Sequence, residues 1–404
     1  MTVESDDPGL ELGESVIEQL FRTQFIERAQ TLGAQTAQRP SDWGDEVEVR
    51  FPHDWRIWVL RPQVPLGMTR PDFVLEPSGA PCEPIAIFTD GKRWHAHPDS
   101  NKLREDSEKR RAARGLGYRV IAVTWNDLHG HALDKSWFDR SWTEKVAPTY
   151  GIPTAQLSRL TDDPLTSLMQ WMASPDDERS RRAAIARALP LMARGTTTVA
   201  SVSGDADSSL ARLAASVLQG NTPVHGPKEW VTAHGPLAIA GRLGALGATD
   251  IALVIDDRAE ALLTADFDRA WRLWLHLSNV IGWRDPEDTF TITTVGGVAT
   301  GAGVGPVDVA LFELTPEWAR LTEHAIARER RLLARFAQAG LPLPTLGTET
   351  GDGFVLSLAW ADAKVAVAWG LTEDDIKATA ADGWTVLDAD AADLETAVTA
   401  SMEG

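Results

Sequence analysis

The sequence predicts an α/β protein, with a mixed sheet flanked by helices in its first third, then a helical connector, and a degenerate second α/β copy at its C-terminus. Two observations carry this prediction. Some segments have apolar residues spaced three and four positions apart, as in helices. Between them lie short segments that are wholly apolar or apolar at every second position, as in strands. Strand-like stretches of the first third also recur, in the same order, near the C-terminus.

The first third is predicted to run helix, strands, helix, strand. Apolar spacing predicts a helix over 13–32, and a strongly charged helix is expected over 101–115, ended by Gly115 and Gly117. Strands are expected within 46–60 and at 72–75, 85–89 and 118–125. The apolar run at 85–89 is of the kind buried on both faces of a sheet.

The length of 404 residues suggests several domains. We expect an α/β domain over 1–145 and a proline-punctuated helical connector over 146–205. A mixed α/β region over 206–315, whose role we leave unassigned, and a degenerate repeat of the first domain over 316–404 complete the chain.

The repeat rests on three matched pairs of segments, with chance similarity of apolar strands as the alternative. They are 117–128 with 383–394, 73–75 with 354–356, and 85–87 with 365–367. On this alignment Gly353 takes the place of Asp72, and Trp369 lies near the place of Asp90. We therefore expect the second copy to lack both carboxylates.

Composition narrows the classes of function. The single cysteine excludes a disulfide framework and a multi-cysteine zinc site, so no zinc is expected, and it fits a cytoplasmic protein. We find no signal peptide and no apolar run long enough for a membrane, so no membrane partner is expected. The net charge of −19 argues against a broad nucleic-acid coat, although residues 92–119 are locally basic.

Two aspartates at the ends of neighbouring predicted strands are the main candidates for chemistry. Asp72 and Asp90 could share a Mg²⁺ ion, or Mn²⁺, because hard cations prefer carboxylate and water oxygens. Such an ion activates water and neutralises phosphate charge. If the strand continues past Asp90, Lys92 lies on the same face. If Asp90-Gly91 is instead a turn, Lys92 points elsewhere.

Three further side chains are candidates for the same site. His95 could act as a general base, and His97, of the same parity, as a phosphate ligand. Glu18 on the first predicted helix could add a carboxylate. Taken singly, each of these residues is more often an ordinary turn, helix or surface residue, so the order of the whole set carries the hypothesis.

That order, Pro71-Asp72 followed by Asp90-x-Lys92, resembles the PD-(D/E)XK restriction-endonuclease-like superfamily. With Trp94-His95 and the stretch 117–125, it is most similar to very-short-patch-repair endonucleases and to nuclease-like modules at the C-terminus of large bacterial superfamily-two helicases. The resemblance covers 12–130. It implies a restriction-endonuclease-like fold, so that 1–145 would be a nuclease domain.

The resemblance also implies roles for single residues. Asp72 would ligate Mg²⁺, Thr89 would offer its carbonyl to the metal, and Asp90 would follow as the next site residue. His95 would be a base or phosphate contact, and Trp94 could wedge into the base stack. Lys92-Arg93 stands where the repair enzymes have Cys-Phe, and their zinc cysteines are absent, so mismatch specificity is not carried over.

The leading hypothesis is a Mg²⁺-dependent DNA endonuclease or nickase acting in DNA repair or phage defence. Basic residues of the charged helix would grip phosphates: Arg104, Lys109, Arg110 and Arg111. The alternative is a catalytically inactive nuclease-fold module that binds DNA or a helicase or defence-complex partner. A third reading is a structural or protein-interaction protein that binds no DNA.

Overall fold

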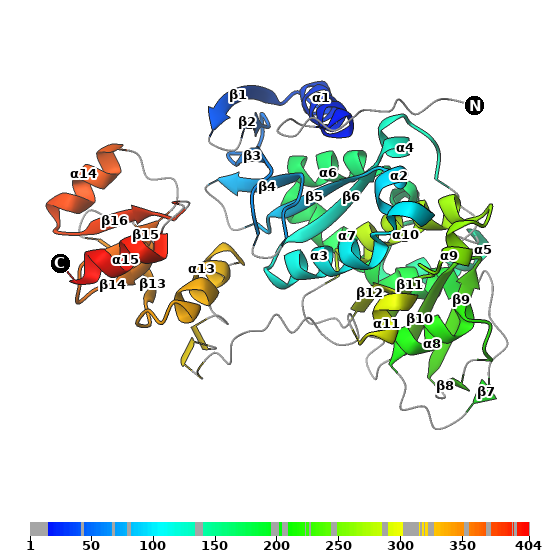
Figure 1. Cartoon of the computed structure of the whole chain (residues 1–404). Coiled ribbons are helices and arrows are strands. Elements are labelled where there is room, and N and C mark those ends of the chain that lie inside the picture. The colour runs from blue at the N-terminus through cyan, green and yellow to red at the C-terminus, as the bar shows by residue number, and fades with distance from the viewer. Residues whose placement is uncertain are drawn as a thin grey trace. The chain divides into compact units, whose positions relative to one another are not determined.

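The computed structural model of the chain describes most of its residues. They are 15–41, 44–66, 69–78, 82–133, 140–194, 202–203, 209–222, 224–225, 228–243, 249–284, 290–301, 315, 317–318, 320–321, 327–350, 355–368, 373–389, 391 and 394–403. They form two compact units. One comprises 1–75, 85–114 and 119–307, and the other comprises 76–84, 115–118 and 308–404. The fold is mixed α/β, with several mixed sheets flanked by helices (Figure 1).

The first third contains the predicted succession of elements. In chain order they are α1 (Val16–Thr31), β1 (Gln35–Ser41), β2 (Gly44–Arg50), β3 (Ile57–Pro62), β4 (Phe73–Ser78), β5 (Ile85–Asp90), α2 (Lys92–His95), α3 (Leu103–Gly115), β6 (Arg119–Thr124), α4 (Trp125–Leu128) and α5 (Arg140–Val146). The six strands lie in the order β1-β2-β3-β4-β5-β6. The pairs β1–β2, β2–β3 and β4–β5 are antiparallel, whereas β5 and β6, joined through α3, are parallel.

The two main helices of this region cover opposite faces of the sheet. Phe21 of α1 packs against Phe73 of β4, with ring centroids 5.1 Å apart. Phe73 pairs with Ile87 of β5, so the next residue, Phe88, points to the other face. There the guanidinium of Arg110 from α3 lies 5.5 Å from the Phe88 ring. Consecutive residues at the end of β5 therefore face different helices.

The middle of the chain adds a helical segment and a second sheet. Its elements include η2 (Ala147–Tyr150), η3 (Thr154–Thr161), α6 (Pro164–Ala173), α7 (Pro175–Arg194), β7 (Val202–Ser203), α8 (Leu210–Leu218), β8 (Val224–His225), β9 (Glu229–His234), β10 (Leu237–Leu243), β11 (Thr249–Ile255), α9 (Ala259–Leu262), α10 (Phe267–Ile281), β12 (Phe290–Thr294) and α11 (Val295–Ala299). The second sheet has the order β12-β11-β10-β9, with β11 and β12 parallel and joined through α10.

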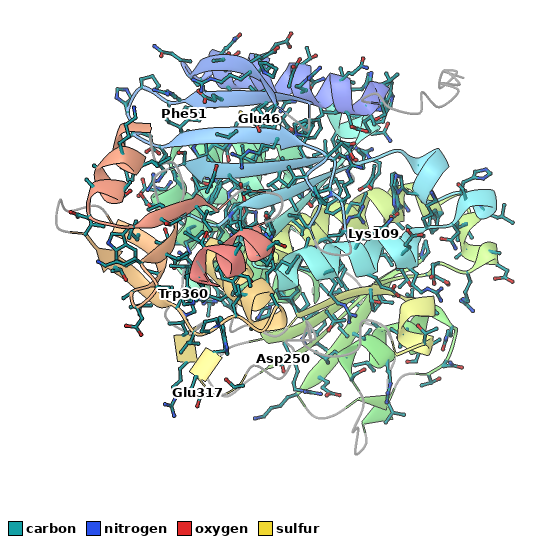
Figure 2. All side chains as sticks on the ribbon, turned by 60° about the vertical axis from the view of Figure 1, so that its left-hand side comes forward. Glu46, Phe51, Lys109, Asp250, Glu317 and Trp360 are labelled. Carbon is teal, nitrogen blue, oxygen red and sulfur yellow. The ribbon has the colours of Figure 1, made fainter. Side chains whose placement is uncertain are left out.

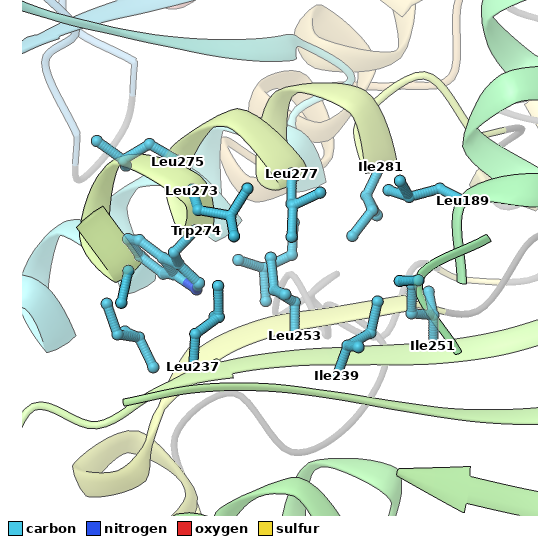
Figure 3. Packing of buried hydrophobic residues seen from close by; sticks show 14 of the residues in the cluster. Leu189, Leu237, Ile239, Ile251, Leu253, Leu273, Trp274, Leu275, Leu277 and Ile281 are labelled. Carbon is cyan, nitrogen blue, oxygen red and sulfur yellow. The ribbon is translucent and has the colours of Figure 1, made fainter. Parts of the chain in front are cut away.

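Helix α10 joins the first two sheets. Leu273, Trp274 and Leu277 point from α10 onto Leu253 and its neighbours in β10 and β11 (Figure 3). The same core extends to η2, α7 and Ala122 of β6. The predicted divisions at 145 and 205 thus fall within one continuous core.

A side-chain amide forms hydrogen bonds with the outer edge of the first sheet. β6 is an edge strand, and Ala122 within it is buried. The Ala122 N–H donates to Asn279 Oδ1, and Asn279 Nδ2 donates to the Ala122 carbonyl, both at 2.8 Å. Asn279 therefore replaces a neighbouring strand and caps an edge that would otherwise leave buried backbone groups unpaired.

The C-terminal region forms a third mixed sheet with its own core. Its elements are α13 (Ala327–Gln338), β13 (Thr345–Glu349), β14 (Val355–Trp360), β15 (Val365–Ala368), α14 (Glu373–Ala381), β16 (Thr385–Asp388) and α15 (Leu394–Glu403). β13, β14 and β15 are antiparallel neighbours, and β16 lies parallel to β15 after α14. Trp360 belongs to the buried cluster of this region (Figure 2).

A related order of connection therefore occurs three times: a helix, a run of neighbouring strands in one sheet (five in the first region, three in each of the others), a crossover helix, and a strand parallel to the one before the crossover. The sequence suggested two copies and left the middle one, built from α8 to β12, unassigned. The C-terminal alignment needs one correction. Phe73 pairs with Ile87, but the residue matched to Ile87, Val367, pairs with Leu358.

That pairing makes Leu358, four residues further along the chain than the predicted position 354, the counterpart of Phe73. The counterpart of Asp72 is therefore Ser357 rather than Gly353. Trp369 and Gly353 lie outside the described residues. The longer loop between β4 and β5 explains the error, because strand patterns alone do not fix the register across a loop of different length.

Among the described residues, no helix combines the length and apolar character that crossing a bilayer demands. Strand β1 was not predicted. Its residues are mostly exposed and polar, and an edge strand with two solvated faces has no alternating pattern to detect.

Replacing the Asn279 amide should weaken the first unit. Asn279→Leu keeps the side-chain volume but leaves the buried N–H and carbonyl of Ala122 unpaired, so we expect a loss of about 2–4 kcal/mol in the free energy of unfolding. Urea unfolding measures it, with the exposed Asn221→Leu as control. Equal stability of the two variants would contradict the edge-capping role.

Candidate active site

The carboxyl end of β5 separates the predicted site residues onto two faces of the sheet. Thr89 lies on the α1 face with Ile87, and Asp90 lies on the α3 face with Phe88. Both residues are buried. Asp72 and Asp90 are therefore near one another at the end of the sheet, but their carboxylates have different partners.

On the α1 face, Asp72 and Glu18 form a carboxylate pair. The Thr89 backbone N–H and hydroxyl both donate to Asp72 Oδ2, at 2.6 and 2.9 Å. Glu18 Oε1 accepts from the Ser15 hydroxyl and completes the N-terminal cap of α1, whereas its Oε2 accepts from Gln63 Nε2 at 3.0 Å. Gln63 in turn donates its backbone N–H to the Asp72 carbonyl at 2.9 Å.

The carboxylate pair is electrostatically strained. Burial and the charge of Glu18 raise the pKa of Asp72 to about 7, and the hydrogen bonds from Thr89 only partly oppose them. Two carboxylates held this closely are stabilised by a shared proton or by a cation. The donors are all hard oxygens, which suit Mg²⁺ or Mn²⁺, and Mg²⁺ commonly takes only one or two protein carboxylates, with water and phosphate as further ligands. The pair thus fits the ion that the sequence predicts.

On the α3 face, four charged groups form a buried ion cluster. Arg110 donates to both carboxylate oxygens of Asp90 at 2.6 Å. His95 Nδ1 lies 2.7 Å from Asp106 Oδ2 and 4.0 Å from Asp90 Oδ1. Two carboxylates and one guanidinium leave a net negative charge, and protonation of His95 makes the cluster neutral.

The pKa values follow from that balance. Burial lowers the pKa of His95, but the hydrogen bond to Asp106 and the charges of Asp90 and Asp106 hold it above its ordinary value. Burial raises the pKa of Asp106, but His95 and Arg110 bring it below its ordinary value. Burial keeps the pKa of Asp90 raised despite Arg110. The charge balance therefore favours the protonated form of His95, whose Nδ1 lies against the Asp106 carboxylate.

The structure corrects the placement of Lys92. β5 ends at Asp90, and Lys92 begins the short helix α2 instead of continuing the strand. Its ammonium group lies 3.3 Å from Asp268 of α10. The strand-face relation with Asp90 therefore does not form, because the backbone becomes helical at Lys92, directly after the extended N-cap residue Gly91.

The predicted phosphate-gripping helix is mostly neutralised. Arg110 forms an ion pair with Asp90. Lys109 pairs with Glu105 at 2.5 Å, and Arg104 lies 4.0 Å from Glu108. Arg111 is half-buried. The local positive charge seen in the sequence therefore does not become a basic surface on α3.

The two remaining predictions concern the segment after α2. His97 is exposed, near the end of that helix. The side chain of Trp94 lies outside the described part of the molecule, so its role as a wedge stays a prediction.

No set of three histidine, cysteine or acidic side chains takes up a metal-binding arrangement within the described residues. Any ion at the carboxylate pair would thus rely on Asp72 and Glu18 and on non-protein oxygens. The backbone carbonyl of Thr89, predicted as a ligand, stays a prediction. Asp90 accepts hydrogen bonds from Arg110 at both carboxylate oxygens, so its role as a metal ligand also stays a prediction.

Two residues at the site were given no role by sequence reasoning. Asp106 had a detectable signal, since it lies with Leu103, Ser107 and Arg110 on the buried stripe of a charged helix. A carboxylate at such a position requires a buried partner. Gln63 had no signal, because nothing in a loop sequence marks a glutamine as a partner for a residue 45 positions away.

Comparisons with known proteins supply no relative. No family model matches the chain, and neither the curated proteins nor the solved structures contain a match.

The raised pKa of Asp72 predicts a pH-dependent stability. Because its folded pKa of about 7 lies above the unfolded value near 4, the protein loses stability as the pH rises from about 4 to 7. Asp72→Asn should remove this loss and be more stable than the wild type at pH 8 by about 2 kcal/mol, after allowance for solvent screening of a partly exposed group. Urea unfolding at pH 5 and pH 8, in chelator, measures it. The exposed Asp45→Asn should follow the wild-type profile.

The ion cluster predicts the opposite behaviour for His95. Its raised pKa means that its stabilisation is full below pH 6.5 and is lost as the pH rises through the folded value. Asp106→Asn should lower the pKa of His95, as followed by NMR titration of the ring protons and assigned with His95→Gln. The buried His276, whose pKa burial lowers, serves as the unchanged reference. A His95 titration unaffected by Asp106→Asn would refute the cluster.

Proposed function

We propose that the chain is a Mg²⁺-dependent endonuclease or nickase that hydrolyses DNA backbone phosphodiesters, in DNA repair or phage defence. One observation carries the proposal: a carboxylate pair, half-buried Asp72 and buried Glu18, lies at the same end of the sheet as an imidazole held by Asp106. These are the groups that metal-assisted phosphodiester hydrolysis requires. The order α1, β3–β5, α3, β6 also agrees with the restriction-endonuclease-like resemblance of the sequence.

Each group has a chemical task in this reaction. Asp72 and Glu18 would hold the cation, and Thr89 fixes the rotamer of Asp72 by its two hydrogen bonds. A bound Mg²⁺ would supply Lewis-acid stabilisation of phosphate charge and a water of lowered pKa. His95, cationic through Asp106, suits donation to a phosphate oxygen or to the leaving oxygen better than proton abstraction.

The inactive-module alternative also has specific support. Asp90, an expected metal ligand, is paired with Arg110, and Lys92 is paired with Asp268. A nuclease fold in which Asp90 and Lys92 are held in ion pairs could bind DNA, or a helicase or defence-complex partner, without cleaving DNA. Metal dependence separates the two functions, since a binding module has no need of the ion.

Nicking of supercoiled plasmid tests the proposal. With Mg²⁺, we expect the wild type to nick and Asp72→Asn and Glu18→Gln to be slower by a factor of about 100 or more, because each removes a ligand charge. Glu18→Gln leaves the helix cap intact, since glutamine also completes a capping box. The exposed Glu27→Gln on the same helix is its matched control. Metal-independent DNA binding without cleavage would favour the inactive module.

A further inference from the structure

Gln63 has a backbone conformation that glutamine seldom adopts. Its φ is +55°, in the left-handed region, and Lys364 is the other non-glycine residue with a positive φ among the described residues. Such a conformation costs roughly 1–3 kcal/mol and persists only where the surroundings hold it in place. The contacts that hold Gln63 in this conformation therefore indicate the function of the conformation.

Three hydrogen bonds hold Gln63, and each leads to a charged residue. Its side-chain Nε2 donates to Glu18 Oε2 at 3.0 Å. Its backbone N–H donates to the carbonyl of Asp72 at 2.9 Å, and its carbonyl accepts from Arg70 Nε at 2.8 Å. One residue at the end of β3 thus contacts both members of the carboxylate pair and a guanidinium.

Arg70 is the cation of this arrangement. It is exposed, and no carboxylate pairs with it within the described part of the chain. Its Nε is anchored on the carbonyl of Gln63, the residue that also contacts Glu18 and Asp72, and this anchor leaves the terminal nitrogens available. A planar guanidinium of this kind matches the oxygens of a phosphate.

We propose that Gln63 is the positioning residue of this site, and that it sets Glu18, Asp72 and Arg70 around a single phosphodiester group that Arg70 binds. The proposal rests on the proposed nuclease function and assigns to it a phosphate-binding residue. The left-handed turn is needed because it presents the amide toward α1 while the same peptide unit holds Asp72 and Arg70. A residue of ordinary φ at the end of β3 would break at least one of the three contacts.

Steady-state nicking kinetics separates positioning from binding. Gln63→Gly relieves the backbone strain and removes the amide, so we expect an unchanged or higher Tm with kcat lower by 10- to 100-fold. Gln63→Asn tolerates the same φ but is one methylene too short to reach Glu18, so it should lose kcat equally. Arg70→Gln should raise KM for plasmid about 10-fold at nearly unchanged kcat, with a shallower salt dependence.

Lys364→Gly is the matched control, because it relieves the same strain far from the site in sequence. It should keep wild-type kcat and KM. Wild-type kcat in Gln63→Gly or Gln63→Asn would overturn the positioning role. A fall in kcat matched by a fall in Tm would overturn it too, since that pattern marks a purely structural residue.

Mn²⁺ binding, measured by calorimetry, separates this inference from the proposed function. If the wild type nicks and the Gln63 variants nick equally well, the inference fails while the nuclease stands. If the wild type binds Mn²⁺ without nicking, the nuclease fails, and a 10-fold weaker affinity in Gln63→Gly still supports positioning. A wild type that neither nicks nor binds Mn²⁺ overturns both.

Discussion

The arrangement of the site depends on the burial of charged side chains at the carboxyl end of β5. Asp90 is 2% exposed, and a carboxylate buried so fully must be paired. Arg110 supplies the pair from α3, and strand alternation places Thr89 on the opposite face, where it holds Asp72. Two polar clusters therefore form back to back. We assign the proposed metal ion to the cluster on the α1 face, because Asp72 and Glu18 interact there unfavourably, whereas Asp90 on the other face is paired with Arg110.

Equivalent strand ends differ between the first and middle regions of the described chain. β5 ends at Asp90 opposite Thr124, and β11 ends at Ile255 opposite Thr294, and both threonines cap the helix that follows. Ile255 packs into the core around α10, which joins the first two sheets. The middle copy has an apolar strand end because that face is buried against α10, so packing there excludes a site.

Much of the fold was predictable from sequence, since apolar periodicity is a local property. The helix at 13–32 and the buried strand at 85–89 appear as α1 and β5. Continuous packing through α10 was not predictable, because tertiary contacts decide which apolar faces meet. At the site, the structure brings Glu18 and Asp72, both named from the sequence, close enough for their charges to interact. Their link through Gln63 was not foreseen, because a side-chain contact across a loop leaves no periodic trace.

The fate of the basic segment shows why charge counts do not give a binding surface. Part of the cation excess over 92–119 is paired with carboxylates, as Arg110 is with Asp90 and Lys109 with Glu105, so the number of cations in the segment overstates the charge left for a ligand. Nucleic-acid affinity follows the number of phosphates neutralised, and a chain of net charge −19 gains little from long-range attraction. Under the proposed function, affinity would then come from few, well-placed contacts at the site, such as Arg70 and a metal ion, or from a partner protein. Such a site would gain selectivity from geometry, because each contact that contributes to binding would also orient the phosphodiester for attack.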